Sequence, residues 1–223
     1  MDISSTDFPL STLESILTAI VGNSHLKNFH LIMNSNKLEK EGAEVFGRVI
    51  KGPADHIKKI SMKGCELGDE GLRVLLKALQ PLNKLSELDL SFNLKHPKGP
   101  GDKDRESTVT AIAEFMDFKG NNLEVFKIAG QKGYEIGEQL DIVFKKMVVG
   151  ENVRITSLDV SGNASGDSGA LALAKALERT TTLQHLAFDK NGTTLRGFLW
   201  LKNGISNNKS LKSMDVPLFD LGA

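Results

Sequence analysis

The chain has 223 residues, and its 28 Lys plus Arg balance its 28 Asp plus Glu, so the formal net charge is zero. Nucleic-acid-binding domains usually carry a basic excess, and this composition gives no support for that class. Cys65 is the one cysteine, which excludes an intrachain disulfide. No secretory h-region opens the sequence, and no apolar run approaches the roughly 18 residues of a membrane span, so we expect a cytoplasmic protein.

Two stretches share one pattern of apolar residues. Residues 155–163 read I-T-S-L-D-V-S-G-N and residues 183–191 read L-Q-H-L-A-F-D-K-N. This is the spacing L-x-x-L-x-L-x-x-N/C of a leucine-rich repeat, in which each unit is a strand followed by a helix. Because one unit cannot bury both apolar faces by itself, neighbouring units must stack. The sequence therefore predicts an α/β solenoid, a ribonuclease-inhibitor-like horseshoe of about six to seven repeats with parallel strands on the concave face and helices on the convex face.

The ninth position of this pattern, called here the asparagine slot, locates the repeats along the chain. Its side chain should bond to backbone groups of a tight turn that would otherwise be buried without partners. By subtraction, successive slots are 29, 28, 38, 32, 28 and 28 residues apart. The extra length of the third unit falls at 94–107, a loop composition rich in Pro, Gly, Lys and Asp, and long loops are either functional or disordered. The slots are assigned to Asn36, Cys65, Asn93, Gln131, Asn163, Asn191 and Phe219.

The same alignment predicts how the chain begins and ends. Residues 1–9 are expected to be a flexible lead-in, and residues 10–223 a single leucine-rich repeat domain. A capping box at Ser11 and Glu14 predicts the first helix, and the first strand is expected at 26–33, two residues longer than the pattern. Because the sequence starts on a helix and stops after a seventh strand, we expect open ends. They would belong to a longer protein, or be covered by a partner or by a second copy in a homodimer.

Residues between the inward-facing ones should point into the concave face and meet a partner. They are basic in the second unit and later acidic with scattered lysines, which suits a protein of complementary charge. The same mosaic also fits a face that is merely solvated. Trp200 either anchors an interface or packs against its neighbouring turn. The candidate concave residues are Lys58, Lys59, Lys63, Glu87, Asp89, Phe92, Asp159, His185, Asp189, Lys190 and Asp215.

We expect no enzyme, no metal and no cofactor. Residues 166–169 spell G-D-S-G, as around the nucleophile of trypsin-like proteases, but they fall in the strand-to-helix turn of a repeat. The histidines form no H-E-x-x-H pair, and Cys65 alone cannot build a zinc site. Cys65 instead fills an asparagine slot, where the pattern allows cysteine.

Three runs of residues resemble a known family. They are L-D-V-S-G-N-A-S-G-D-S-G-A-L-A-L-A-K-A-L at 158–177, D-K-N-G-T-T-L-R-G-F at 189–198 and S-L-K-S-M-D-V-P-L-F-D at 210–220. These runs are similar to the repeat domain of CARMIL proteins, and the resemblance covers about residues 10–221. It implies a cytosolic, cytoskeleton-associated scaffold that promotes actin assembly. Its partners would be actin-regulatory proteins such as class I myosin or the branched-actin nucleator.

Two other interpretations stay open. Ran GTPase activators share this repeat length, but they carry an acidic tail, whereas this sequence ends L-F-D-L-G-A. Ribonuclease inhibitors are rich in cysteine and strongly acidic, and this chain is neither. We therefore expect a non-catalytic interaction scaffold, with a GTPase-activating repeat protein as the alternative.

Overall fold

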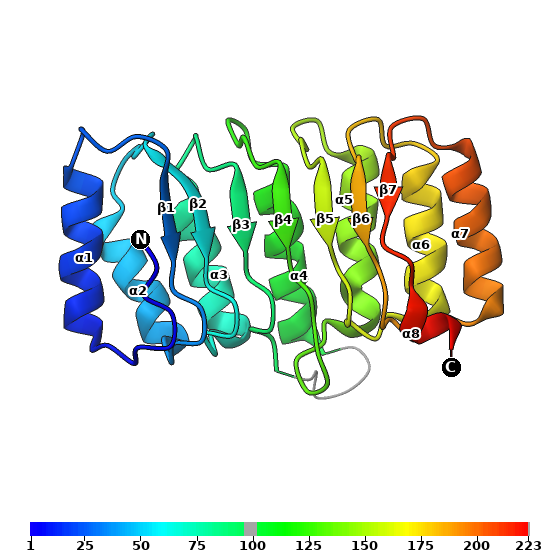
Figure 1. The fold of residues 1–223 in the computed structure, drawn as a ribbon, viewed down its shortest axis with the longest axis horizontal. Helices are drawn as coiled ribbons and strands as arrows, with labels where there is room; N and C mark the ends of the chain where they lie inside the picture. The colour runs from blue at the N-terminus through cyan, green and yellow to red at the C-terminus, as the bar shows by residue number, and fades with distance from the viewer. Residues whose placement is uncertain (96–101, 223) are drawn as a thin grey trace.

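The computed structural model describes residues 1–95 and 102–222 and arranges them in two layers (Figure 1). Seven strands form one parallel sheet whose order follows the sequence. Helices return the chain behind the sheet (Figure 1), as the repeat pattern predicts. The strands are β1 Phe29–Ile32, β2 Ile57–Ser61, β3 Glu87–Asp89, β4 Val125–Lys127, β5 Ser157–Asp159, β6 His185–Ala187 and β7 Ser213–Met214. The helices are α1 Leu10–Gly22, α2 Glu39–Val49, α3 Gly68–Leu79, α4 Lys103–Met116, η1 Gly137–Leu140, α5 Asp141–Val149, α6 Gly166–Leu177, α7 Leu195–Asn207 and α8 Leu218–Leu221.

The core lies between the two layers and repeats from unit to unit. Leu88, Phe126, Leu158 and Leu186 stand opposite one another on neighbouring strands, and all four are buried. Each of these four strands contributes one such inward residue because side chains alternate between the two faces. The apolar stripe of the following helix covers it. The polar residues of these strands therefore point to the open face of the sheet.

An asparagine ladder joins the turns that follow the strands. The Asn163 amide donates to the carbonyls of Val160 and Ile128, both at 2.9 Å, and its oxygen accepts the Ile136 N–H at 3.1 Å. Each ladder asparagine therefore bonds to its own turn and to the preceding unit. Asn36, Asn93 and Asn191 make the corresponding bonds.

Cys65 takes its place in the ladder with a thiol in place of an amide. Its Sγ lies 3.2 Å from the Met33 carbonyl, and its backbone N–H donates to the Asn93 side chain at 2.9 Å. Burial raises the pKa of the Cys65 thiol from 9.0 to about 11. The thiol therefore stays protonated at neutral pH, which suits a structural donor rather than a nucleophile.

Two of the predicted slots are wrong. Gln131 is exposed, because residues 131–134 form a small hairpin in which Gln131 and Tyr134 exchange backbone hydrogen bonds. Phe219 is 63% exposed, and the neighbouring Asp220 closes the ladder instead. The Asp220 carboxylate accepts the N–H groups of Asn191 at 2.9 Å and Gly192 at 3.1 Å.

The first strand is shorter than the sequence analysis expected. It covers Phe29–Ile32 rather than 26–33, because Asn28 adopts a left-handed φ of 50° that ends the extended backbone. Phe29 stands opposite Ile57 and His30 opposite Lys59, so Lys58 has no residue opposite it on β1 and forms a bulge.

The N-terminal residues, expected to be a flexible lead-in, instead lie along β1. The Ile3 N–H donates to the Ile32 carbonyl, and the Ser5 N–H donates to the Asn34 carbonyl, both at 2.9 Å. The Thr6 N–H donates to the ladder oxygen of Asn36 at 2.9 Å. This segment therefore supplies the backbone groups that a preceding repeat would present.

The loop expected at 94–107 is shorter than predicted. Helix α4 begins at Lys103, because the Asp102 carboxylate caps it by accepting the N–H groups of Asp104 at 3.1 Å and Arg105 at 3.4 Å. Residues 96–101 of this predicted loop lie outside the described residues.

Replacing Asn163 with alanine tests the ladder. Because the variant leaves backbone groups of two units buried without partners, we expect it to lower the free energy of unfolding by about 1–3 kcal/mol in urea denaturation. Gln131→Ala is the matched control: its exposed side chain makes no ladder bond, and the change should stay within about 0.5 kcal/mol. Equal stability of the two variants would contradict the ladder.

Candidate protein-binding face

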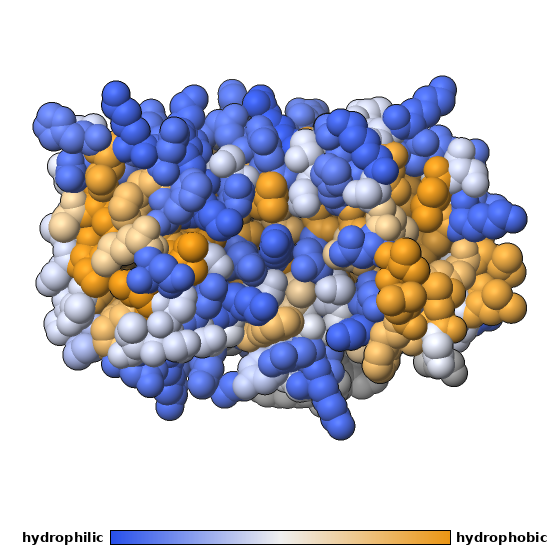
Figure 2. Space-filling model, viewed as in Figure 1, coloured by the Kyte–Doolittle hydropathy of each residue, from blue (hydrophilic) through white to orange (hydrophobic). Residues whose placement is uncertain are grey.

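A groove crosses the open face of the sheet near the ends of the strands. It has a volume of about 530 Å³ and is called here the concave groove. Hydrophilic residues dominate the middle of this face, and hydrophobic residues gather over the β7–α8 segment (Figure 2). The charged and aromatic residues that line the groove are Lys63, Asp89, Phe92, Lys127, Lys132, Glu135, Asp159, Lys190 and Phe219.

Each end of the concave groove holds an aromatic ring beneath a lysine. The Lys63 ammonium lies 4.6 Å from the centroid of the Phe92 ring, and the Lys190 ammonium lies 5.8 Å from that of Phe219. Such cation–π contacts hold the side chains in place without neutralising the charge. The groove therefore presents two positive, partly apolar ends.

The acidic residues of the groove are engaged by their own turns. The Asp89 carboxylate accepts the Ser91 N–H at 3.0 Å. The Asp159 carboxylate accepts both the N–H of Ser161, at 3.1 Å, and its hydroxyl, at 2.6 Å. Among the described residues, the ammonium groups of Lys63, Lys127 and Lys190 pair with no carboxylate. The charges left open for a partner are therefore mainly positive.

The structure brings only part of the predicted concave set together. Lys63, Asp89, Phe92, Asp159 and Lys190 line the groove. The other predicted residues do not line this groove. Lys59 is paired with Glu87 at 2.9 Å, and His185 lies 2.7 Å from the Ser213 hydroxyl. Lys58 lies beside a separate hollow near α1, and Asp215 is exposed after β7.

Asp189 has a structural contact that its sequence position did not indicate. Its carboxylate accepts the N–H groups of Phe219 at 3.2 Å and Asp220 at 3.1 Å, at the start of α8. Free N–H groups at a helix start attract such an acceptor. Asp189 therefore holds α8 against the last ladder turn.

The predicted concave set lacked several residues that line the groove, among them Lys127 and Phe219. Lys127 stands in register with Asp89 and Asp159 on the neighbouring strands, so the repeat alignment held the signal that places it on this face. Phe219 was assigned to the asparagine slot, which hid its exposure.

Trp200 lies outside the concave groove. It is half-buried against the core, and the Arg196 guanidinium lies 5.6 Å from its ring. Exposed apolar residues of the last two helices include Leu195 and Leu199 on α7 and Leu218 and Leu221 on α8. The C-terminal end of the solenoid is therefore apolar.

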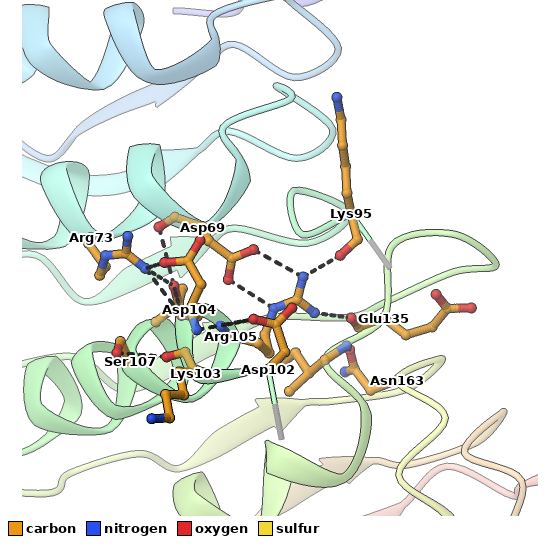
Figure 3. Close-up of polar contacts among 12 residues, drawn as sticks. Asp69, Arg73, Lys95, Asp102, Lys103, Asp104, Arg105, Ser107, Glu135 and Asn163 are labelled. Atoms are coloured by element: carbon orange, nitrogen blue, oxygen red, sulfur yellow. Dashed lines mark hydrogen bonds and ion pairs between the residues drawn. The ribbon is translucent and has the colours of Figure 1, made fainter. Parts of the chain in front are cut away.

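A buried arginine fixes the lengthened units beside the groove (Figure 3). Arg105 is 1% exposed, and the Asp69 carboxylate holds its guanidinium through two bonds, of 2.9 and 3.2 Å. The same guanidinium donates to the carbonyls of Lys95 and Glu135. It therefore ties the segment after β3 to the segment after β4, where Glu135 lines the concave groove.

Replacing Arg105 with methionine tests this connection. Because Asp69 would lose its cation, we expect a loss of roughly 3–5 kcal/mol in urea unfolding. Arg73→Met is the control, since its pair with Asp104 is partly exposed and should contribute at most about 1 kcal/mol. If the two variants lose equal stability, Arg105 has no special role.

Comparisons with known proteins agree with the repeat architecture. The leucine-rich repeat family matches residues 55–76 and 152–174. The chain is 26% identical over 220 residues to protein CARMIL of Dictyostelium discoideum. The matched region covers 99% of the chain and 20% of that protein. These findings support a leucine-rich repeat domain of the CARMIL family. The resemblance drawn from the sequence is thereby confirmed, as is the predicted solenoid.

Two further relatives bear on function. The human capping protein, Arp2/3 and myosin-I linker protein 3 is 26% identical over 228 residues, covering 99% of the chain and 15% of that protein. The Rho GTPase-activating protein gacW of Dictyostelium discoideum is 29% identical over 180 residues, covering 78% of the chain and 15% of that protein. The chain thus spans one fifth or less of the length of these relatives.

No described helix has both the length and the apolar character needed to cross a membrane. Within residues 1–95 and 102–222, no group of three or more His, Cys, Asp or Glu side chains is placed to hold a metal ion.

Proposed function

We propose that this chain is a non-catalytic protein-binding scaffold that acts in the regulation of actin assembly. The concave groove carries this proposal, because it presents aromatic rings and lysines that pair with no carboxylate among the described residues. Similarity to CARMIL along 99% of the chain supports the actin context. We further propose that the chain is cytoplasmic and cytoskeleton-associated.

The charges of the concave groove indicate what the partner would present. Since Asp89 and Asp159 are engaged by their own turns, complementary charge would come from acidic side chains meeting Lys63, Lys127 and Lys190. The human relative is named as a linker of capping protein, Arp2/3 and myosin-I. These three are therefore the first partners to test.

Direct binding to purified capping protein, Arp2/3 complex and a class I myosin tail tests the proposal. We expect at least one of them to bind the parent chain in surface plasmon resonance, and Lys63→Glu with Lys190→Glu to weaken that binding roughly tenfold, because attraction becomes repulsion. Sedimentation of the chain alone comes first, since a second copy at the apolar C-terminal end would form a homodimer, one of the alternatives that the sequence left open.

The control is a charge reversal of the same size on the convex helices α3 and α7, Lys77→Glu with Lys202→Glu, which should leave this binding unchanged. Binding that is insensitive to the concave reversal would move the site elsewhere. Absence of binding to all three proteins would refute the actin-regulatory partner set.

A GTPase-activating repeat protein is the second candidate, favoured by the 29% identity to gacW. A single-turnover GTP hydrolysis assay with purified Ran and Rho GTPases separates the two functions. The scaffold proposal expects an unchanged rate, whereas an acceleration that saturates with the chain would favour the alternative.

A further inference from the structure

Among the described residues, ion pairs bridge the seams between the successive convex helices α1 to α7 at every seam but one. None connects α5 to α6. The bridges are Arg48–Glu14 at 3.0 Å, Lys40–Glu70 at 2.6 Å, Arg73–Asp104 at 2.7 Å, Lys146 to Asp117 just after α4 at 3.6 Å, and Arg196–Asp167 at 3.3 Å.

A comparison of α3 with α6 shows why this seam is open. Both helices begin Gly-Asp, and the third residue is Glu70 in α3 but Ser168 in α6. Glu70 reaches back to Lys40 of the preceding helix, whereas a serine has neither the charge nor the length for such a bridge. Four residues later, α3 carries Val74 where α6 carries the smaller Ala172.

The result is an apolar groove between α5 and α6, with a volume of about 560 Å³, called here the convex groove. Phe144 and Val148 of α5 form one wall, and Leu171, Ala172 and Ala176 of α6 form the other. On each helix the lining residues recur at the i, i+3, i+4 spacing of a single helix face. Small alanine side chains keep the groove deep enough to admit larger ones.

The α6 rim of the convex groove is positive. Lys175 and Arg179 are exposed one helical turn apart, and neither forms an ion pair among the described residues. Glu178 lies on the same rim, and on α5 Lys145 is already paired with Asp141. The two cations on the groove side of α6 are therefore available to acidic groups.

We propose that the convex groove binds an amphipathic helix of a protein partner. The apolar stripe of that helix would lie between α5 and α6, and an acidic flank would lie along Lys175 and Arg179. This is the helix-in-groove mode of recognition, in which apolar residues at i, i+3, i+4 and i+7 are the anchors. The site is separate from the concave groove and does not rest on the function proposed for it.

A stapled, fluorescein-labelled helical peptide of about 14 residues, ~21 Å long, provides the test. It carries leucines at i, i+3, i+4 and i+7 and glutamates along one flank, and its twin carries lysines in place of the glutamates. In fluorescence anisotropy, the glutamate peptide should bind the parent chain at least roughly tenfold more tightly than the twin. In the variant Lys175→Glu with Arg179→Glu, this preference should reverse.

Lys77→Glu is the matched control, because Lys77 has in α3 the position that Lys175 has in α6. It should keep the parent's preference, as should the concave reversal Lys63→Glu with Lys190→Glu. Ala172→Glu, which blocks the groove, should weaken binding of both peptides, with folding verified by circular dichroism. The proposal is overturned if the parent binds neither peptide saturably, if it binds both equally, or if the α6 reversal leaves the preference unchanged.

Discussion

The side-chain amide of the asparagine ladder is the contact on which the stacking of these repeats depends. A strand that turns sharply into a helix leaves backbone N–H and C=O groups pointing into the protein, where water cannot reach them. Asn163 and Asn191 satisfy such groups in two units at once, because one amide both donates and accepts. At the two ends of the ladder, Thr6 donates its N–H to Asn36 and Asp220 accepts the N–H of Asn191.

The contacts between neighbouring helices vary more from unit to unit than the contacts between neighbouring strands. The strands are held by backbone bonds that every residue can form, whereas the helices meet through side chains that differ between units. Where the side chains carry opposite charges, as in Lys40 and Glu70, the seam closes. Where one helix offers serine and alanine, as α6 does with Ser168 and Ala172, the seam stays open. The regular fold thus carries one irregular outer surface.

The sequence predicted the parts of this molecule that obey the repeat period. The slots at Asn36, Asn93, Asn163 and Asn191 and the parallel sheet followed from spacing alone, because stacking leaves few other ways to bury the apolar faces. The assignment of Gln131 to an asparagine slot was wrong because the hairpin after β4 shifts the turn.

The contacts of individual charged side chains could not be derived in this way. Asp189 was placed on the correct turn, but its contact with α8 depends on a backbone path that the pattern does not contain. Arg105 reads as a surface residue of a helix, and only the fold places Asp69 opposite its guanidinium. That guanidinium also contacts Glu135, so one side chain touches three consecutive units. In most solenoids each repeat contacts only its nearest neighbours. The stability of the array is then approximately the sum of the stabilities of single repeats and of the interfaces between neighbouring repeats. Here Arg105 of the third unit bonds to both the second and the fourth unit, so a single side chain supports two successive interfaces between repeats.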